Sequence, residues 1–105
     1  MLRIYDVMLD AIEDMRPMLR SIERHDRDLA SQLRRAASSV VLNLAEGSGS
    51  FGGVRTQRYR TALGSARETM AALLVAQRFG YVDGVPAALA ARMNRIIGTL
   101  VRVAA

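Results

Sequence analysis

Apolar residues recur every three or four positions along four stretches of the chain, which is the spacing of one face of a helix. No stretch alternates apolar and polar residues over a useful length, so we predict no sheet. Each stretch instead predicts an amphipathic helix that buries one face. The expected core residues are Ile4, Met8, Ala11, Ile12, Met15, Leu19 and Ile22; Leu29, Leu33, Ala36, Ala37, Val40 and Leu44; Tyr59, Ala62, Leu63, Ala66, Met70, Leu73 and Leu74; and Leu89, Met93, Ile96, Ile97 and Leu100.

Helix-breaking residues separate the four stretches. The joint between the first two helices is charged, and Asp26 or Asp28 can cap the second helix. Gly47 is expected to end the second helix in a left-handed conformation, Gly80 closes the third, and Pro86 fits the first turn of the fourth. Short connections make neighbouring helices antiparallel. We therefore expect one all-α domain over residues 1–105, an antiparallel up-down-up-down four-helix bundle.

The composition narrows the class of protein. The chain has 105 residues, half of them apolar, and no cysteine, which excludes a disulfide scaffold and thiolate metal sites. The longest apolar run, Met70–Ala76, is far shorter than the ~20 residues that a membrane span needs. Acidic residues stand where a signal peptide would have its apolar core. We expect a cytoplasmic protein with no membrane partner.

The charge is unevenly distributed along the chain. All 15 basic residues are arginine, and residues 1–30 carry a net charge of −2 while residues 31–105 carry +7. A basic region of this kind attracts polyanions. The alternative explanation is a coding bias toward arginine together with ordinary solvated helix faces.

Several arginines of the basic region stand in rows. In the third helix Arg60, Arg67 and Arg78 share one azimuth, and in the fourth Arg95 and Arg102 stand seven residues apart. Such rows suit the spaced phosphates of nucleic acid, while five aromatic residues are too few for a base-stacking platform, so we expect weak sequence readout. The candidate nucleic-acid-binding residues are Arg55, Arg58, Arg60, Arg67, Arg78, Arg92, Arg95 and Arg102.

Patterns for catalysis and cofactor binding are weak. The segment Gly47–Gly52 matches G-x-G-x-x-G, but a helix rather than a strand precedes it, which favours an interhelix loop. Asp6, Asp10 and Glu13 share a flank of the first helix away from its apolar stripe, which is typical of a solvated face. His25 is the only histidine, which removes a Ser-His or Cys-His pair. We expect no enzyme, no cofactor and no metal.

A polar stripe with spacings of 3, 4, 4 and 3 residues runs along the second helix beside its apolar face. Arg35 can bond Ser39 one turn away, and Asn43 can bond Glu46. We interpret the stripe as a structural seam that ties this helix to a neighbour. Its residues are Gln32, Arg35, Ser39, Asn43 and Glu46.

Some apolar residues fall outside the expected core stripes. The second helix is apolar nearly all round at residues 40–44, and the third has a similar surplus. A monomeric bundle buries one face of each helix, so the surplus predicts self-association through a repeated interface; scattered exposed apolar residues are the alternative. The candidate interface residues are Val41, Leu42, Ala72, Val75 and Phe79.

The segment Gln32–Gly47, QLRRAASSVVLNLAEG, fits the pattern Q-L-R-R-A-x-x-S-x-x-x-N-x-A-E-G. In this the chain resembles a four-helix-bundle family first recognised as proteins encoded by intervening sequences in bacterial large-subunit ribosomal RNA genes. Ala62–Glu68 is similar to the family's A-x-G-S-x-x-E block, and Phe79–Val82 to its L-G-Y-L block. Residues 54–59 depart from the family, which has a more aromatic entry to the third helix.

The resemblance implies a left-handed bundle that assembles as a homopentamer. It also implies a relation to the accessory variability-determinant protein of diversity-generating retroelements, a basic pentamer that binds a reverse transcriptase and nucleic acid. No catalytic residues carry over. We therefore expect a non-enzymatic oligomeric accessory protein that binds nucleic acid. RNA is the expected nucleic acid, and a reverse transcriptase is a candidate protein partner. The alternative is a structural protein–protein interaction module that binds no nucleic acid.

Overall fold

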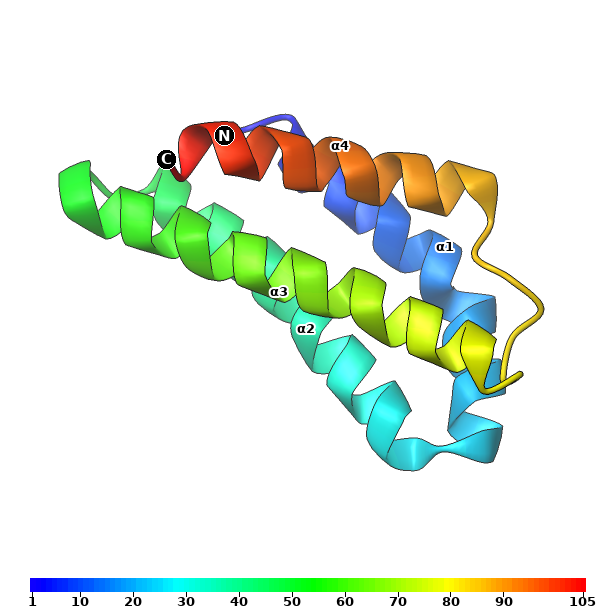
Figure 1. Ribbon diagram of the computed structural model, residues 1–105. Helices are drawn as coiled ribbons and strands as arrows, with labels where there is room; N and C mark the ends of the chain where they lie inside the picture. The colour runs from blue at the N-terminus through cyan, green and yellow to red at the C-terminus, as the bar shows by residue number, and fades with distance from the viewer.

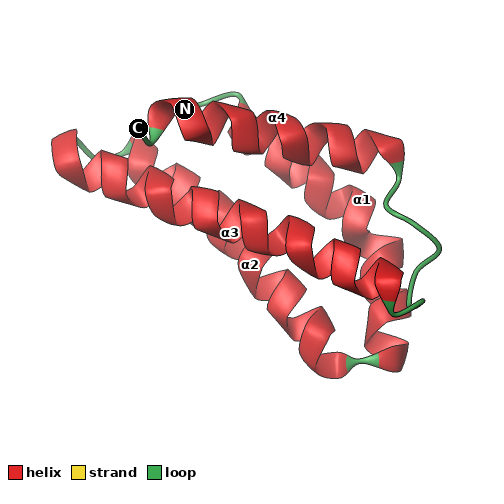
Figure 2. Ribbon diagram, viewed as in Figure 1, coloured by secondary structure: helices red, strands yellow, loops and turns green.

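The computed structural model describes all residues 1–105 and contains four helices and no strand (Figure 2). The helices are α1 (Ile4–His25), α2 (Arg27–Ser48), α3 (Gly52–Arg78) and α4 (Ala87–Val103). Both α1 and α3 pack against α2 and α4, so consecutive helices run antiparallel around one core (Figure 1). The bundle is elongated, with extents of 42 × 24 × 19 Å. The prediction of an all-α antiparallel four-helix bundle is confirmed.

The core is built from one face of each helix. All six predicted core residues of α2 are buried, and four of the five in α4 are buried, with Ile97 half-buried. In α1, Met18 joins the core while Ile12 and Leu19 lie at its edge. None of the four helices combines the length and apolar character needed to cross a membrane.

The buried face of α3 differs from the prediction. Thr69, Ala72 and Ala76 are buried, whereas Leu74, expected in the core, is 45% exposed. The three buried residues follow Ser65 at helical spacing, and Ser65 Oγ lies 2.7 Å from Ser39 Oγ of α2, so this face of α3 is turned toward α2, the most extensive helix contact in the molecule. Small side chains there allow the two helices to approach closely. A prediction based on the spacing of large apolar residues therefore misses this face. The expectation that Ala72 lies outside the buried stripe is wrong, because its exposed fraction is only 6%.

The helix boundaries follow the expected breaks, with one correction. Asp26 is the N-cap of α2, and its Oδ1 accepts a hydrogen bond from the Leu29 N–H at 2.9 Å. Pro86 stands immediately before α4. The expectation that Gly47 ends α2 in a left-handed conformation is wrong, because α2 continues through Gly47 to Ser48. Because Gly47 has an ordinary helical φ, the need for glycine at this position comes from close packing and not from backbone conformation.

Gly80 closes α3 as predicted and adopts a φ of +78°. The Tyr81 N–H donates to the Ala76 carbonyl at 2.9 Å, and the Gly80 N–H donates to the Gln77 carbonyl at 3.0 Å. These two bonds form a Schellman motif, which satisfies carbonyls at the end of the helix. The Tyr81 carbonyl in turn accepts a hydrogen bond from Ser21 Oγ at 2.6 Å, which fastens the α3–α4 connection to α1.

The Gly80→Ala variant should be less stable than the wild type by about 1 kcal/mol, because a Cβ disfavours the left-handed conformation. Thermal unfolding followed by circular dichroism should show a melting temperature lower by roughly 4–8 °C. The Gly84→Ala variant is the control, since Gly84 lies in the same connection without a positive φ or nearby atoms. Equal stability of the two variants would contradict the left-handed assignment.

Candidate functional site

Two of the eight candidate arginines pair with carboxylates inside the protomer. Arg92 of α4 pairs with Asp14 of α1. Arg58 of α3 pairs with Glu46 of α2, with 3.0 Å between Nη2 and Oε2. Each pair bridges two packed helices, so Arg58 and Arg92 have structural partners before any ligand is considered.

Two further candidates bind backbone carbonyls at the ends of helices. Arg60 Nε donates to the Ala104 carbonyl at 3.1 Å, just beyond α4. Arg55 Nε donates to the Gly47 carbonyl at 3.2 Å, and its guanidinium lies 5.7 Å from the centroid of the Phe51 ring. Carbonyls at helix C-termini lack intrahelical partners, and Arg60 satisfies such a carbonyl at Ala104. Arg55 is a second donor to the Gly47 carbonyl, which also accepts from the Ser50 N–H at 3.1 Å.

The other four candidate arginines are exposed on α3 and α4. Arg67, Arg78 and Arg95 have no hydrogen-bond or ion-pair partner in the protomer, and Arg102 contacts only Thr99 Oγ1 at 3.4 Å. The eight candidates therefore do not form one uniform surface. These four are the ones whose guanidinium groups remain open to an external anion.

The polar stripe of α2 contacts α3 at two levels. Asn43 Nδ2 donates to the Ser39 carbonyl at 2.9 Å and lies 3.1 Å from Ser39 Oγ. Ser39 Oγ is in turn 2.7 Å from Ser65 Oγ of α3. The second level is the Glu46–Arg58 ion pair. These contacts replace the Arg35–Ser39 and Asn43–Glu46 bonds expected from spacing. Gln32 and Arg35 are exposed and make no side-chain bond.

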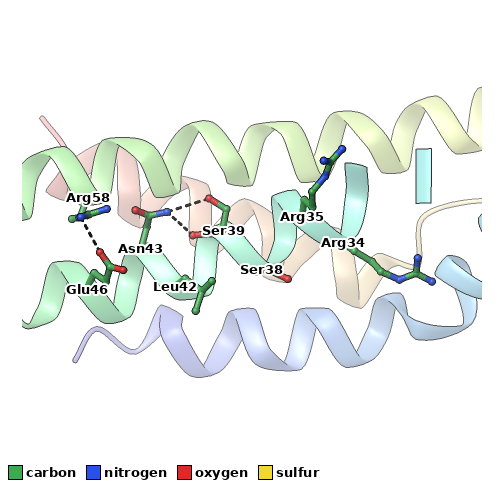
Figure 3. A pocket seen from close by; sticks show the side chains of 8 residues that line it. All are labelled: Arg34, Arg35, Ser38, Ser39, Leu42, Asn43, Glu46 and Arg58. Atoms are coloured by element: carbon green, nitrogen blue, oxygen red, sulfur yellow. Dashed lines mark hydrogen bonds and ion pairs between the residues drawn. The ribbon is translucent and has the colours of Figure 1, made fainter. Parts of the chain in front are cut away.

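An open hollow lies over the polar stripe, between α2 and α3 (Figure 3). Figure 3 shows the Arg35 side chain directed toward α3 and the Leu42 side chain directed toward α1. The hollow contains residues of the polar stripe, together with Arg58 from the candidate nucleic-acid-binding residues and Leu42 from the candidate interface residues. Two further lining residues, Arg34 and Ser38, were not identified as site residues from the sequence. Helical spacing from Arg35 and Leu42 could have found both. Its lining residues are Arg34, Arg35, Ser38, Ser39, Leu42, Asn43, Glu46 and Arg58.

Arg34, one of the two residues that were missed, pairs with Glu23 of α1. In the same hollow Arg58 pairs with Glu46, so Arg35 is the one lining arginine without an acidic partner. The arrangement offers a single open guanidinium beside hydroxyl and amide groups.

The exposed apolar candidates lie on two separate surfaces. Leu42 is 61% exposed and lines a groove between α1 and α2 with Val41, Leu9 and Ile12. We call this the α1–α2 apolar groove. Leu9, which is 40% exposed, was not identified from the sequence.

The second apolar surface is at the C-terminal end of α3. Phe79, 68% exposed, lines a shallow groove with Val75, Leu74 and Arg78. Arg78 therefore borders a predicted self-association surface. Ala72 is buried within the protomer and takes no part in either surface.

Comparison with known proteins identifies a family. A family model described as 23S rRNA-intervening sequence protein matches residues 2–101, nearly the whole chain. No curated protein and no solved structure matches the chain. In this structure, no group of three or more His, Asp or Glu side chains is placed to hold a metal ion.

Proposed function

Since the chain belongs to the 23S rRNA-intervening sequence protein family, we propose that it is a non-enzymatic oligomeric accessory protein that binds nucleic acid. RNA is the nucleic acid that we propose as its ligand. The observation that carries the proposal is the set of exposed arginines without acidic partners on α3 and α4. Arginine forks contact phosphate oxygens well and need no particular base. Binding through them is therefore expected to show little sequence preference.

The charge balance of the chain supports this proposal. Residues 31–105 carry a net charge of +7, and of the three acids in that part only Glu46 is paired. Assembly would multiply this positive charge over one particle. A reverse transcriptase is proposed as a protein partner by analogy with the retroelement accessory protein that the family resembles.

The proposed assembly is a homopentamer built through the exposed apolar residues. The α1–α2 apolar groove and the Val75–Phe79 surface are distinct, and contact between two different surfaces generates a ring when the rotation closes. The number five comes from the family resemblance. Light scattering on the wild type tests it: a monomer contradicts self-association, and a dimer contradicts only the number.

We expect the Arg67→Gln/Arg95→Gln variant to bind RNA more weakly than the wild type at low salt, for every sequence tested. Each phosphate contact contributes about 0.7–0.9 to the slope of log affinity against log salt concentration, so losing two should flatten the slope by roughly 1.5. Fluorescence polarisation with labelled RNA and DNA across a salt series measures both effects. Arg60 is left unchanged because it donates to the Ala104 carbonyl at the end of α4, and Arg78 because it borders an apolar groove.

The Arg3→Gln/Arg27→Gln variant is the matched control. Both residues are exposed, lack side-chain partners and lie outside α3 and α4, so the same loss of charge should change the slope less. Equal effects of the two variants would show that total charge, and not the α3–α4 surface, governs binding. If the wild-type oligomer binds no nucleic acid at low salt, the protein–protein interaction module becomes the better account.

A further inference from the structure

The outward face of α1 carries charge in two separate blocks. Its first half presents three acids, and its second half presents three arginines beside Glu23, an exposed acid that pairs with Arg34 of α2. The three acids and the three arginines are exposed, and the three ion pairs of the protomer involve none of them. The acidic block is Asp6, Asp10 and Glu13, and the basic block is Arg16, Arg20 and Arg24.

The outer residues of the two blocks are too far apart to neutralise each other within one chain, whereas Glu13 and Arg16 are only three residues apart. At 1.5 Å per residue, Asp6 and Arg24 are separated by about 27 Å along the helix, and Asp10 and Arg20 by about 15 Å. The helix dipole favours acids at the N-terminus and arginines at the C-terminus, but its effect is confined to the first and last turns. It therefore accounts for Asp6 and Arg24 and leaves the inner residues unexplained.

The blocks are complementary to themselves when the helix is reversed. Asp6 and Arg24 are equally distant from Met15 along the chain, and so are Asp10 and Arg20. Two copies of α1 can lie antiparallel with residue 15 of one at the same level as residue 15 of the other. Asp6 of each copy then faces Arg24 of the other, and Asp10 faces Arg20. Glu13 then falls beside Arg16. Each of the three acids of the acidic block meets an arginine of the other copy, and each pair occurs twice.

We propose that the outward face of α1 binds a second copy of this chain in an antiparallel, two-fold contact held by these reciprocal ion pairs. A two-fold contact closes after two copies. Its symmetry differs from that of the contacts in the proposed ring, although Leu9 of the α1–α2 apolar groove lies one turn from Glu13, and it would join two protomers or two rings. It does not depend on nucleic-acid binding.

Charge reversal at one pair tests the contact. Asp10→Arg places two repulsive pairs in the interface, and Arg20→Asp does the same from the other side, so each variant should dissociate at a concentration at least about tenfold higher than the wild type. Asp10→Arg/Arg20→Asp in one chain restores both pairs and should recover association, as should an equimolar mixture of the single variants. Sedimentation velocity at about 20 mM and about 300 mM salt measures the masses, and the higher salt should weaken the wild-type contact.

The Glu68→Arg variant is the control, because Glu68 is an exposed acid of α3 without a partner and undergoes the same change of charge. It should associate as the wild type does. The proposal is overturned if Asp10→Arg and Glu68→Arg weaken association equally, or if the double charge swap stays dissociated although circular dichroism shows it folded. Either result leaves RNA binding, measured separately, unaffected.

Discussion

Replacing Gly47 by alanine is expected to destabilise the protein by about 1–2 kcal/mol and to lower the melting temperature by roughly 5–10 °C. Gly47 is buried inside α2, and an added Cβ would stand 2.8 Å from Cδ1 of Tyr59 and nearer still to Cε1. Tyr59 is only 7% exposed, so its ring cannot yield without disturbing the core. Alanine raises helix propensity by about 1 kcal/mol, which offsets only part of an overpacking cost of about 2–3 kcal/mol, the upper end of the usual range, as expected for so close a contact with a buried ring.

The Gly64→Ala variant provides the matched control for this prediction. Gly64 is exposed within α3, and no atom lies within 4 Å of its added Cβ, so alanine should stabilise the helix by up to about 1 kcal/mol. Urea unfolding of both variants measures the difference. Tyr59→Leu in the Gly47→Ala background should then cost less than Tyr59→Leu alone. Additive costs would mean that the Tyr59 ring does not restrict position 47.

The Leu42→Arg variant should fold normally but fail to assemble. Leu42 is 61% exposed in the protomer, so arginine is easily accommodated there. At an apolar contact between copies the same side chain would bury an unpaired charge, at a cost of several kcal/mol. Light scattering at about 300 mM salt, where exposed charge contacts are screened, should give the mass of a single chain, 11.5 kDa.

The control for Leu42→Arg is Val101→Arg. Val101 is an exposed apolar residue of α4 outside both apolar grooves, and its replacement should leave the assembly intact. An assembled Leu42→Arg variant would place the interface elsewhere. Dissociation of both variants would indicate a general sensitivity to added charge instead of a contact at the α1–α2 apolar groove.

The fold could be predicted from the sequence because α1, α2 and α4 each concentrate large apolar residues on one face. The buried face of α3 could not, since part of it consists of small residues such as Ala72 and Ala76, to which a hydrophobic pattern gives little weight. Gly47 shows the same limit. A glycine at this position suggests the end of a helix, but glycine is required there because the ring of Tyr59, twelve residues later in the chain, leaves no room for a Cβ.

The candidate site was harder to predict than the fold. Helical spacing placed the arginines on their helices, but which of them are free depends on partners far away in the sequence. Asp14 neutralises Arg92 from 78 residues away, and the Ala104 carbonyl holds Arg60 from 44 residues away. No local pattern contains such pairs, because they arise only when α4 packs against α1 and α3.

The helix order has a kinetic consequence. Three of the four interhelix contacts join helices that follow one another in the chain, and only the contact between α1 and α4 joins distant segments. Local contacts require little loop-closure entropy, which favours folding in microseconds to milliseconds. The helical hairpins can therefore form early, and the slowest search is the docking of α4 onto α1. Until that step the part of α4 that packs on α1 lies open, which makes the nascent bundle most prone to misassembly with its own copies just before it closes.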